Sequence, residues 1–428
     1  MNNRASSRQL SPLIQNQHLR VSAIQGKMSS LTKLLENMHE AAFYFWIVAA
    51  TFPTLANKTF NYDAFAQSLT QYVPNVYPGY ASLAFALCTI LRLFVAKPLM
   101  YSPLALVIMI LAIFTALAGL IQADQALLFA YLAITCLSVV GIALLLNDSV
   151  RFRRTSEITI VLVLTYYVVA LLYLGAPQNR WVGGIHPNIF SAATLLSSLF
   201  ALTARKWLGL ASILFGIAIA VLVEARYAFV SGISFLIIFS AIHTATSRTK
   251  TVMFLIGTAL LLLVVGPYLL ERVLLVNDTA RGLVGGISGR DVLNANFWPL
   301  FYQHPIVGFG FRYPFRIITP HSGVLNLILQ VGPLAAAAIL LIYLQALSRG
   351  LHRFMKARVA LGPIHSMQIG SFALIPLFVF QPQILNLGDG AGIASLMCLA
   401  GAILQSQSHW KNRSDLHVRV RPFRRTNL

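Results

Sequence analysis

Apolar segments recur along the whole chain and are separated by polar connections. Each segment is close to the ~20 residues that an α-helix needs to cross the hydrocarbon core of a bilayer. We count twelve of them, at residues 41–56, 76–95, 101–121, 126–146, 158–174, 189–204, 208–223, 229–243, 252–270, 324–346, 364–380 and 390–405. Because lipid cannot satisfy exposed backbone N–H and C=O groups, these segments are expected to be helical. The pattern predicts an all-α, polytopic membrane protein with about twelve transmembrane helices.

The composition excludes an ordinary soluble protein. Of the 428 residues, 57% are hydrophobic and 10% are charged, whereas soluble domains carry about 25% charged residues. The first 40 residues are polar and basic, without the pattern of a cleavable signal peptide. We therefore expect a basic tail at 1–40, a membrane domain at 41–406 and a second basic tail at 407–428.

Lysine and arginine divide unequally between the two sides of the predicted membrane domain. With twelve spans, 24 of the 32 lysines and arginines lie in the tails or in the connections on the same side as the tails, and eight lie on the other side. Cytoplasmic connections carry the positive excess in membrane proteins, so both termini are expected in the cytoplasm. The net charge of +20 is then mainly a topology signal that also favours anionic lipid, and no nucleic-acid partner is expected.

One polar interruption, at residues 271–323, contains five arginines and no lysine: Arg272, Arg281, Arg290, Arg312 and Arg316. The predicted topology puts this loop outside the cytoplasm, where positive residues are usually few. Arginine suits bidentate binding of phosphate, whereas a single arginine at a helix end is often an interfacial anchor. The anchor interpretation is strongest for Arg272 and Arg281.

Three predicted helices begin on the outer side beside polar residues. Before the sixth, eighth and tenth apolar segments stand, in order, Arg180 with His186 and Asn188, Glu224 with Arg226, and His321 with Ser322. A helix N-terminus carries the positive end of the dipole and unpaired N–H groups, which favour an anion. Pro187 suits a first helical turn, and Asn188 or Ser322 could act as a cap. The joint pattern predicts an anion site on the outer side.

The outer loop itself predicts a short helix. Ser288 and Asp291 have the spacing of a capping box, so we expect a helix at about 289–303 with Arg290 in its first turn. Its aromatic residues suit the membrane interface. The segment 304–310, which holds a proline and two glycines, would end the helix and form a tight turn with close backbone approach.

No metal or cofactor is expected. The DxD and HExxH patterns, the Walker phosphate loop and GxSxG are all absent. Cys88, Cys136 and Cys398 lie in apolar segments, so we interpret them as small buried residues rather than as a disulfide or zinc framework. If the chain is an enzyme, we therefore expect it to handle a phosphorylated, lipid-soluble substrate without a metal.

Five short segments resemble the O-antigen ligase and polysaccharide polymerase superfamily of bacterial membrane glycosyltransferases. They are 184–188 (Gly-Ile-His-Pro-Asn), Arg226 at the head of an apolar helix, 289–291 (Gly-Arg-Asp), 304–310 (His-Pro-Ile-Val-Gly-Phe-Gly) and 321–332, from His-Ser-Gly into the following apolar run. Their order, spacing and predicted membrane side agree with that family over roughly residues 180–340. The family histidine is commonly followed by Asn rather than Ser322, and the family arginine often follows Ser rather than Ala225.

The resemblance implies a metal-independent transfer of a glycan on the periplasmic side of the bacterial inner membrane, with an undecaprenyl-diphosphate-linked donor. Arg226 and Arg290 would hold the diphosphate and stabilise charge on the leaving group. His321 would accept the proton of the attacking hydroxyl. Further candidates for substrate contact are Arg180, His186, Asn188, Arg312 and Arg316.

The acceptor separates two versions of this function. A polymerase uses a sugar of another lipid-linked repeat, and an O-antigen ligase uses a sugar of lipid A-core; the Gly-Arg-Asp run and the moderate loop length favour the polymerase slightly. A transporter of lipid-linked glycans is a rival interpretation, although no internal repeat is visible and the notable charges lie at span ends rather than near the midplane. A non-catalytic assembly subunit would leave the arginines and His321 unexplained.

Overall fold

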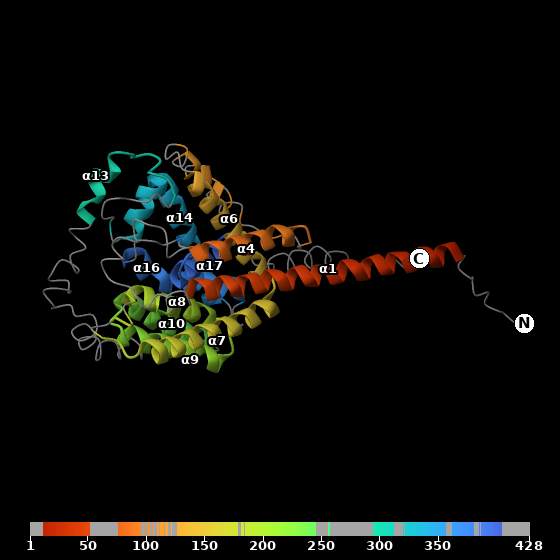
Figure 1. The fold of residues 1–428 in the computed structure, drawn as a ribbon, viewed down its shortest axis with the longest axis horizontal. Helices are drawn as coiled ribbons and strands as arrows, with labels where there is room; N and C mark the ends of the chain where they lie inside the picture. Colours follow the sequence, from red (N-terminus) through yellow and green to blue (C-terminus); the bar gives the residue numbers. More distant parts are fainter. Residues whose placement is uncertain are drawn as a thin grey trace, which may run out of the picture.

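The computed structural model describes residues 12–51, 76–95, 126–178, 181–183, 185–244, 294–311, 322–356, 362–380 and 387–404, with a few isolated positions between 99 and 121 and at 256, 320 and 385. The described residues contain twelve α-helices, one 3-10 helix and no β-sheet. In chain order they are α1 (Pro12–Thr51), α4 (Val76–Leu93), α6 (Ala126–Leu146), α7 (Ser149–Leu174), α8 (Pro187–Ala201), α9 (Lys206–Leu222), α10 (Arg226–Thr244), α13 (Phe297–Phe301), α14 (Gly323–Lys356), α15 (Pro363–Gly370), the 3-10 helix η3 (Ser371–Leu374), α16 (Ile375–Phe380) and α17 (Gly390–Ile403). They form one bundle, from which the first half of α1 projects (Figure 1).

The helices follow the predicted apolar segments closely. Ten of the twelve segments are helical in the described residues, 101–121 is described only at scattered positions that are almost all helical, and 252–270 lies outside the described residues except at 256. α7 begins before its predicted segment because Asp148 caps it: one carboxylate oxygen accepts hydrogen bonds from the backbone N–H groups of Val150 and Arg151, both at 3.1 Å. α1 passes through residue 40 without a break, so the tail from Pro12 and the first predicted span form one helix.

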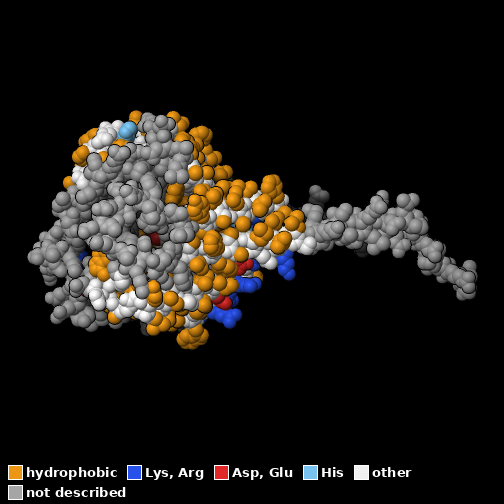
Figure 2. All heavy atoms as spheres, in the orientation of Figure 1, with side chains coloured by type: hydrophobic (Ala, Val, Ile, Leu, Met, Phe, Trp, Pro, Cys, Tyr) orange, Lys and Arg blue, Asp and Glu red, His pale blue; other side chains and the backbone are white. Residues whose placement is uncertain are grey.

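Four helices in the described part of the chain are long and apolar enough to cross a bilayer. They are Phe129–Leu146, Ser149–Leu174, Arg226–His243 and Gly323–Phe354, with mean hydropathies between 1.5 and 2.4. Their outer faces expose large apolar side chains, such as Leu172 on α7 at 82%, and hydrophobic side chains dominate the described surface in Figure 2. Such a surface is unfavourable in water and is matched by lipid tails. The chain is therefore a multi-pass membrane protein.

The starts of α7 and α9 lie together, since Arg205 pairs with Glu157, and the starts of α8 and α10 lie together, since Tyr227 bonds to the Asn188 carbonyl. We name the end at which α7 and α9 begin the charged end, and the opposite end, at which α8 and α10 begin, the site end. At the charged end Arg151 pairs with Glu36 at 2.6 Å and with Asp148 at 3.5 Å, and Arg205 pairs with Glu157 at 3.2 Å. Lys, Arg, Asp and Glu side chains gather beside the start of α7 in Figure 2. Each ion pair near the surface contributes about 0–1 kcal/mol to stability. The pairs therefore distinguish this end of the bundle by its charge but add little to its stability.

A buried polar network ties α1 to α4 near the charged end. The ring of His39, which is fully buried, lies with Nδ1 2.9 Å from the Arg92 guanidinium and Nε2 3.1 Å from the Thr89 hydroxyl. Because arginine only donates, Nδ1 is the acceptor and Nε2 carries the proton. Thr89 in turn donates to the carbonyl of Phe85 at 2.8 Å. Each polar group of this network therefore has a hydrogen-bond partner, as buried polar groups require.

Aromatic rings join four helices in the core beside this network. Phe43 and Trp46 of α1, Phe85 of α4, Phe152 of α7 and Phe200 of α8 are all fully buried. Neighbouring ring centroids are 5.3–6.2 Å apart. Aromatic pairs at this spacing contribute about 0.5–1.5 kcal/mol each beyond the area they bury. These rings fix α8, whose other end carries the candidate site.

We expect Phe85→Ala to destabilise the protein by about 3–5 kcal/mol, because it leaves a cavity among rings that cannot close over it. Thermal unfolding of the detergent-purified protein measures the loss. Phe94→Ala is the matched control, since that ring is 83% exposed and faces lipid or water. Equal shifts in the two variants would contradict the packing described here.

Candidate functional site

The start of α8 is built from the residues directly before it. His186 is the N-cap, and its Nδ1 accepts a hydrogen bond from the backbone N–H of Asn188 at 3.2 Å. Pro187 occupies the first turn, as the sequence predicts. The prediction that Asn188 caps this helix is wrong: Asn188 supplies the backbone donor, and His186 supplies the cap. Because Nδ1 accepts, the neutral ring carries its proton on Nε2.

Two small turns hold His186 in place. Gln178 and Trp181 exchange backbone hydrogen bonds of 2.9 Å, and the N–H of Ile185 donates to the carbonyl of Val182 at 2.9 Å. The ring of Trp181 packs edge-on against the His186 ring, with centroids 5.0 Å apart. The imidazole is therefore fixed by its cap and by an aromatic neighbour.

α10 begins after an abrupt reversal of the chain. The N–H of Glu224 donates to the carbonyl of Val221 at 3.1 Å, and the N–H of Ala225 donates to that of Ala220 at 2.8 Å. This pair of bonds is a Schellman motif, and it puts Glu224 in the left-handed region with φ 52°. A residue other than glycine pays roughly 1–2 kcal/mol there. The reversal places Arg226 at the first position of α10.

The first turns of α8 and α10 are joined directly. The hydroxyl of Tyr227 donates to the backbone carbonyl of Asn188 at 2.6 Å. The Ser191 hydroxyl lies 3.3 Å from the Tyr227 oxygen and donates to it. Both Tyr227 and Ser191 are buried. Two helix N-termini therefore lie side by side at the site end.

The electrostatics of these two helix starts favour an anion. Neither α8 nor α10 has an acidic residue in its first turn, and α10 begins with Arg226, which is half-buried. α17 also begins at the site end and packs against α8, but Asp389 caps it by accepting a hydrogen bond from the N–H of Gly392 at 2.7 Å. A carboxylate thus already matches the dipole of α17, whereas the positive ends of α8 and α10 add to the charge of Arg226. Among the side chains that the structure describes, Arg226 is the only lysine or arginine at the site end.

α14 is broken in its first half. Gly332 has φ 78° and ψ 163°, outside the helical region, and Pro333 follows it. Proline has no N–H, so the carbonyl of Leu329 loses its helical donor, and the kink also separates the carbonyl of Gln330 from its usual partner. The residues before the break form a half-helix, from Gly323 to Val331.

The segment 304–310 repairs this break. The backbone N–H of Phe309 donates to the carbonyl of Leu329 at 2.7 Å, and that of Gly310 donates to the carbonyl of Gln330 at 2.9 Å. Gly308 has φ 70°, and a Cβ there would lie 2.6 Å from the Leu329 oxygen. The sequence predicts the tight turn and the close backbone approach, and both are confirmed. The sequence does not identify the broken part of α14 as the partner of this turn. The available signal was Gly332 directly before Pro333, which predicts a break in the helix.

The predicted loop helix is confirmed in part in the described residues. Residues 294–295 are helical and are followed, after a turn at Asn296, by α13 (Phe297–Phe301). The chain turns from Tyr302 onward, just before the His304–Pro305 pair that the sequence predicts as the stop. The first part of the predicted helix, 289–293, lies outside the described residues.

The structure brings together three of the predicted site residues: His186, Asn188 and Arg226 all lie in the joined helix starts. The others lie outside the described residues: Arg180, Arg290, Arg312, Arg316 and His321. Sequence inspection missed Tyr227 and Ser191, which link the two helices. A tyrosine directly after an arginine at a helix start gave no specific signal.

In the parts of the chain that the structure describes, no three His, Cys, Asp or Glu side chains gather in a way that could hold a metal ion. No known protein family, curated protein or solved structure matches the chain.

We expect Gly332→Ala to destabilise the site end. A Cβ there would collide with the carbonyl oxygen of Ile306, and overpacking of this kind costs about 1–3 kcal/mol, with roughly 1 kcal/mol more from the positive φ. Thermal unfolding measures the change. Gly362→Ala is the control, because nothing lies within 4 Å of its Cβ position; a loss there as large as at Gly332 would show that the break is not specifically repaired.

Proposed function

We propose that this chain is a membrane-embedded glycosyltransferase of surface-polysaccharide synthesis. It transfers a glycan from an undecaprenyl-diphosphate-linked donor to a sugar hydroxyl, without a metal, in the manner of a polysaccharide polymerase. In this proposal it spans the bacterial inner membrane about twelve times, with both termini in the cytoplasm and the site end in the periplasm. The observation that carries the proposal is the 2.6 Å hydrogen bond between Tyr227 and the Asn188 carbonyl, which joins two helix N-termini beside Arg226.

The proposed topology draws support from the described cations. Arg92, Arg151, Arg205 and Arg349 lie toward the charged end, in or beside the helix termini that the sequence assigns to the cytoplasm. An excess of positive residues is typical of the cytoplasmic side. The site end then faces the periplasm, where a lipid-linked glycan presents its sugar.

The proposed chemistry matches a diphosphate leaving group. As the acceptor oxygen attacks the anomeric carbon, the bond from that carbon to the diphosphate oxygen breaks, and the diphosphate leaves with the electron pair. Arg226 and the N–H groups of α8 and α10 would stabilise this charge, with Arg290 assigned to the same role from the sequence. His321, also assigned from the sequence, would take the proton of the attacking hydroxyl.

Reconstitution tests the proposal directly. Purified protein in liposomes that contain undecaprenyl-diphosphate-linked repeat units should lengthen the glycan and release undecaprenyl diphosphate, at the same rate with and without EDTA. Movement of the donor across the bilayer without a new glycosidic bond would instead identify a transporter. Transfer only to an added lipid A-core acceptor would identify a ligase.

Arg226→Lys should lower the transfer rate by about 10²-fold, the scale of losing one donor to a developing anion. A lysine keeps the charge but cannot form the planar, bidentate contact. Arg205→Lys is the matched control, because that side chain is 75% exposed at the charged end. Full activity of Arg226→Lys would contradict this role and would indicate that Arg226 is an interfacial anchor.

His321→Ala should abolish transfer while membrane expression stays normal, since loss of a general base costs about 10²–10⁴-fold. His352→Ala, on the exposed last turns of α14 at the charged end, is the control. Quantified glycan products from equal amounts of membrane-inserted protein give the comparison. A rate close to wild type would remove His321 from the mechanism.

A further inference from the structure

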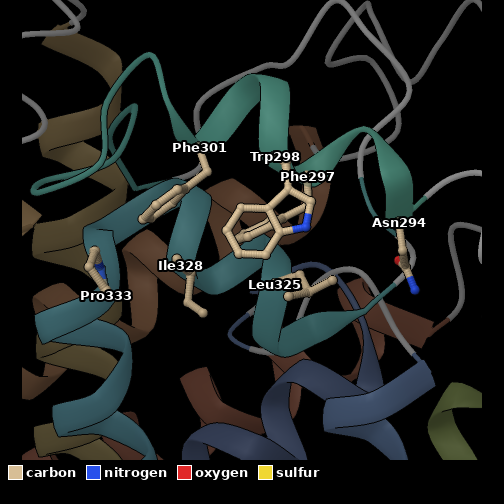
Figure 3. A pocket seen from close by; sticks show the side chains of 7 residues that line it. All are labelled: Asn294, Phe297, Trp298, Phe301, Leu325, Ile328 and Pro333. Carbon is tan, nitrogen blue, oxygen red and sulfur yellow. The ribbon is translucent and has the colours of Figure 1, made fainter.

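Two apolar features lie away from the joined helix starts and have no part in the proposed reaction. One is a groove between α13 and the half-helix of α14, lined mainly by aromatic and aliphatic side chains such as Trp298 and Ile328 (Figure 3). The other is a row of apolar positions along the first half of α1, the part that projects from the bundle (Figure 1). The groove has no repeating pattern that identifies an occupant, whereas the row on α1 does.

Apolar residues recur in the first half of α1 with alternating spacings of three and four residues. As positions a and d of a seven-residue repeat, they are Ile14, Gln17, Val21, Ile24, Met28, Leu31, Leu35 and Met38. All of these residues except Gln17 are apolar. Apolar residues at a and d through successive repeats are typical of a helix that pairs with another helix in a coiled coil. We name these positions the seam.

The seam is open to a partner where its side chains are described. Leu31, Met38 and Phe45 occupy successive d positions and are 51%, 43% and 57% exposed. Trp46 and Ile47, on the side of α1 that packs into the bundle, are fully buried. The seam therefore lies on the outer side of α1 and continues from the projecting part onto the bundle. A second helix can lie along it without displacing α4 or α7, which pack on α1.

The course of α1 disfavours a lipid surface as the partner. The helix passes through residue 40 without a break, so residues 12–40 extend away from the bundle (Figure 1) for about 40 Å at 1.5 Å per residue. A helix that lies among lipid headgroups would have to bend where it leaves the membrane, and it would need a broad apolar face. The seam holds seven of the ten Ile, Leu, Val and Met residues between 12 and 38, which is the narrow pattern of a coiled coil.

Charge disfavours the C-terminal tail of the same chain as the partner. Residues 407–428 carry six lysines and arginines and one acidic residue, Asp415, while residues 12–38 carry Arg20, Lys27, Lys33 and Glu36. Both segments are therefore positive and repel each other. The tail also lacks the apolar repeat that would fill the other half of the seam.

The flanking positions favour a parallel pair of identical helices. In such a pair each g residue stands opposite the e residue that follows it on the other helix, so Arg20 would stand opposite Gln25, and Lys27 opposite Thr32. No cation then stands opposite a cation. An antiparallel pair would set g positions against g positions and bring Arg20 and Lys27 together. Two copies inserted with the same orientation in one membrane can pair only in parallel.

We propose that the first half of α1 forms a parallel, two-stranded coiled coil with the same segment of a second copy, beyond the charged end. The β-branched residues Ile14 and Val21 at position a favour two strands, and Gln17 would form one polar layer that fixes the register. The pairing is independent of the reaction proposed above. It places the site ends of the two copies on the same side of the membrane.

Disulfide cross-linking of the full-length chain in its membrane tests the seam. Cysteines at facing d positions of a parallel coil lie within the roughly 7 Å between Cα atoms that a disulfide can bridge. Oxidised Leu31→Cys should give at least about tenfold more covalent dimer than Lys33→Cys, because Lys33 is at position f, on the outer side of the coil. Lys33 is exposed on the same helix, and the unmodified chain gives the background from Cys88, Cys136 and Cys398.

A charge in the seam tests the same pairing without a cysteine. Leu31→Glu should weaken the dimer about tenfold or more, which corresponds to about 1.4 kcal/mol of association. Ser30→Glu adds the same charge at an exposed position beside the seam and should leave the dimer intact. Native mass spectrometry over a concentration series measures the dimer, and thermal unfolding of both variants checks that the bundle is unchanged.

Four results would overturn the proposal. They are equal cross-linking of Leu31→Cys and Lys33→Cys, a disulfide-free mass of one or three copies for the unmodified chain, a Leu31→Glu dimer as stable as the unmodified one, and cross-links from residue 31 to the tail of the same chain. Quenching of a fluorophore at residue 31 by spin-labelled lipid, without dimers, would instead show that the helix lies on the membrane.

Discussion

The rest of this structure depends on one constraint: inside a membrane every backbone N–H and C=O must find a partner within the protein. Continuous helices meet it on their own, and α14 does not, because Gly332 and Pro333 release the carbonyls of Leu329 and Gln330. The loop at 304–310 returns to that point and supplies two backbone donors. A broken helix at a membrane interface is costly unless it is repaired in this way. The repair fixes the half-helix that begins directly after Ser322, which packs against α13.

The same constraint shapes the two helix starts at the site end. The first turn of a helix leaves N–H groups without partners, and α8 and α10 bring two such turns together through Tyr227 and Asn188. α17 satisfies its own first turn with Asp389. The contrast matters because an acidic cap would weaken the potential that favours an anion. His186 caps α8, and α10 begins with Arg226, with the exposed Glu224 two residues before it.

Much of the fold could be predicted from the sequence, because hydrophobic segments of membrane length determine where helices form. α6 has the bounds that its apolar run predicts. The predictions failed where tertiary contacts decide. The cap of α8 is His186 rather than Asn188, because Trp181 and the preceding turns fix the imidazole. The loop segment 304–310 bonds to the carbonyls of Leu329 and Gln330, about twenty residues away in sequence, and no local pattern reveals this contact. The position of Arg226 at a helix start could be predicted, because it directly precedes an apolar run. The contact of Tyr227 could not, because a buried tyrosine hydroxyl looks like any interfacial tyrosine until its acceptor is known.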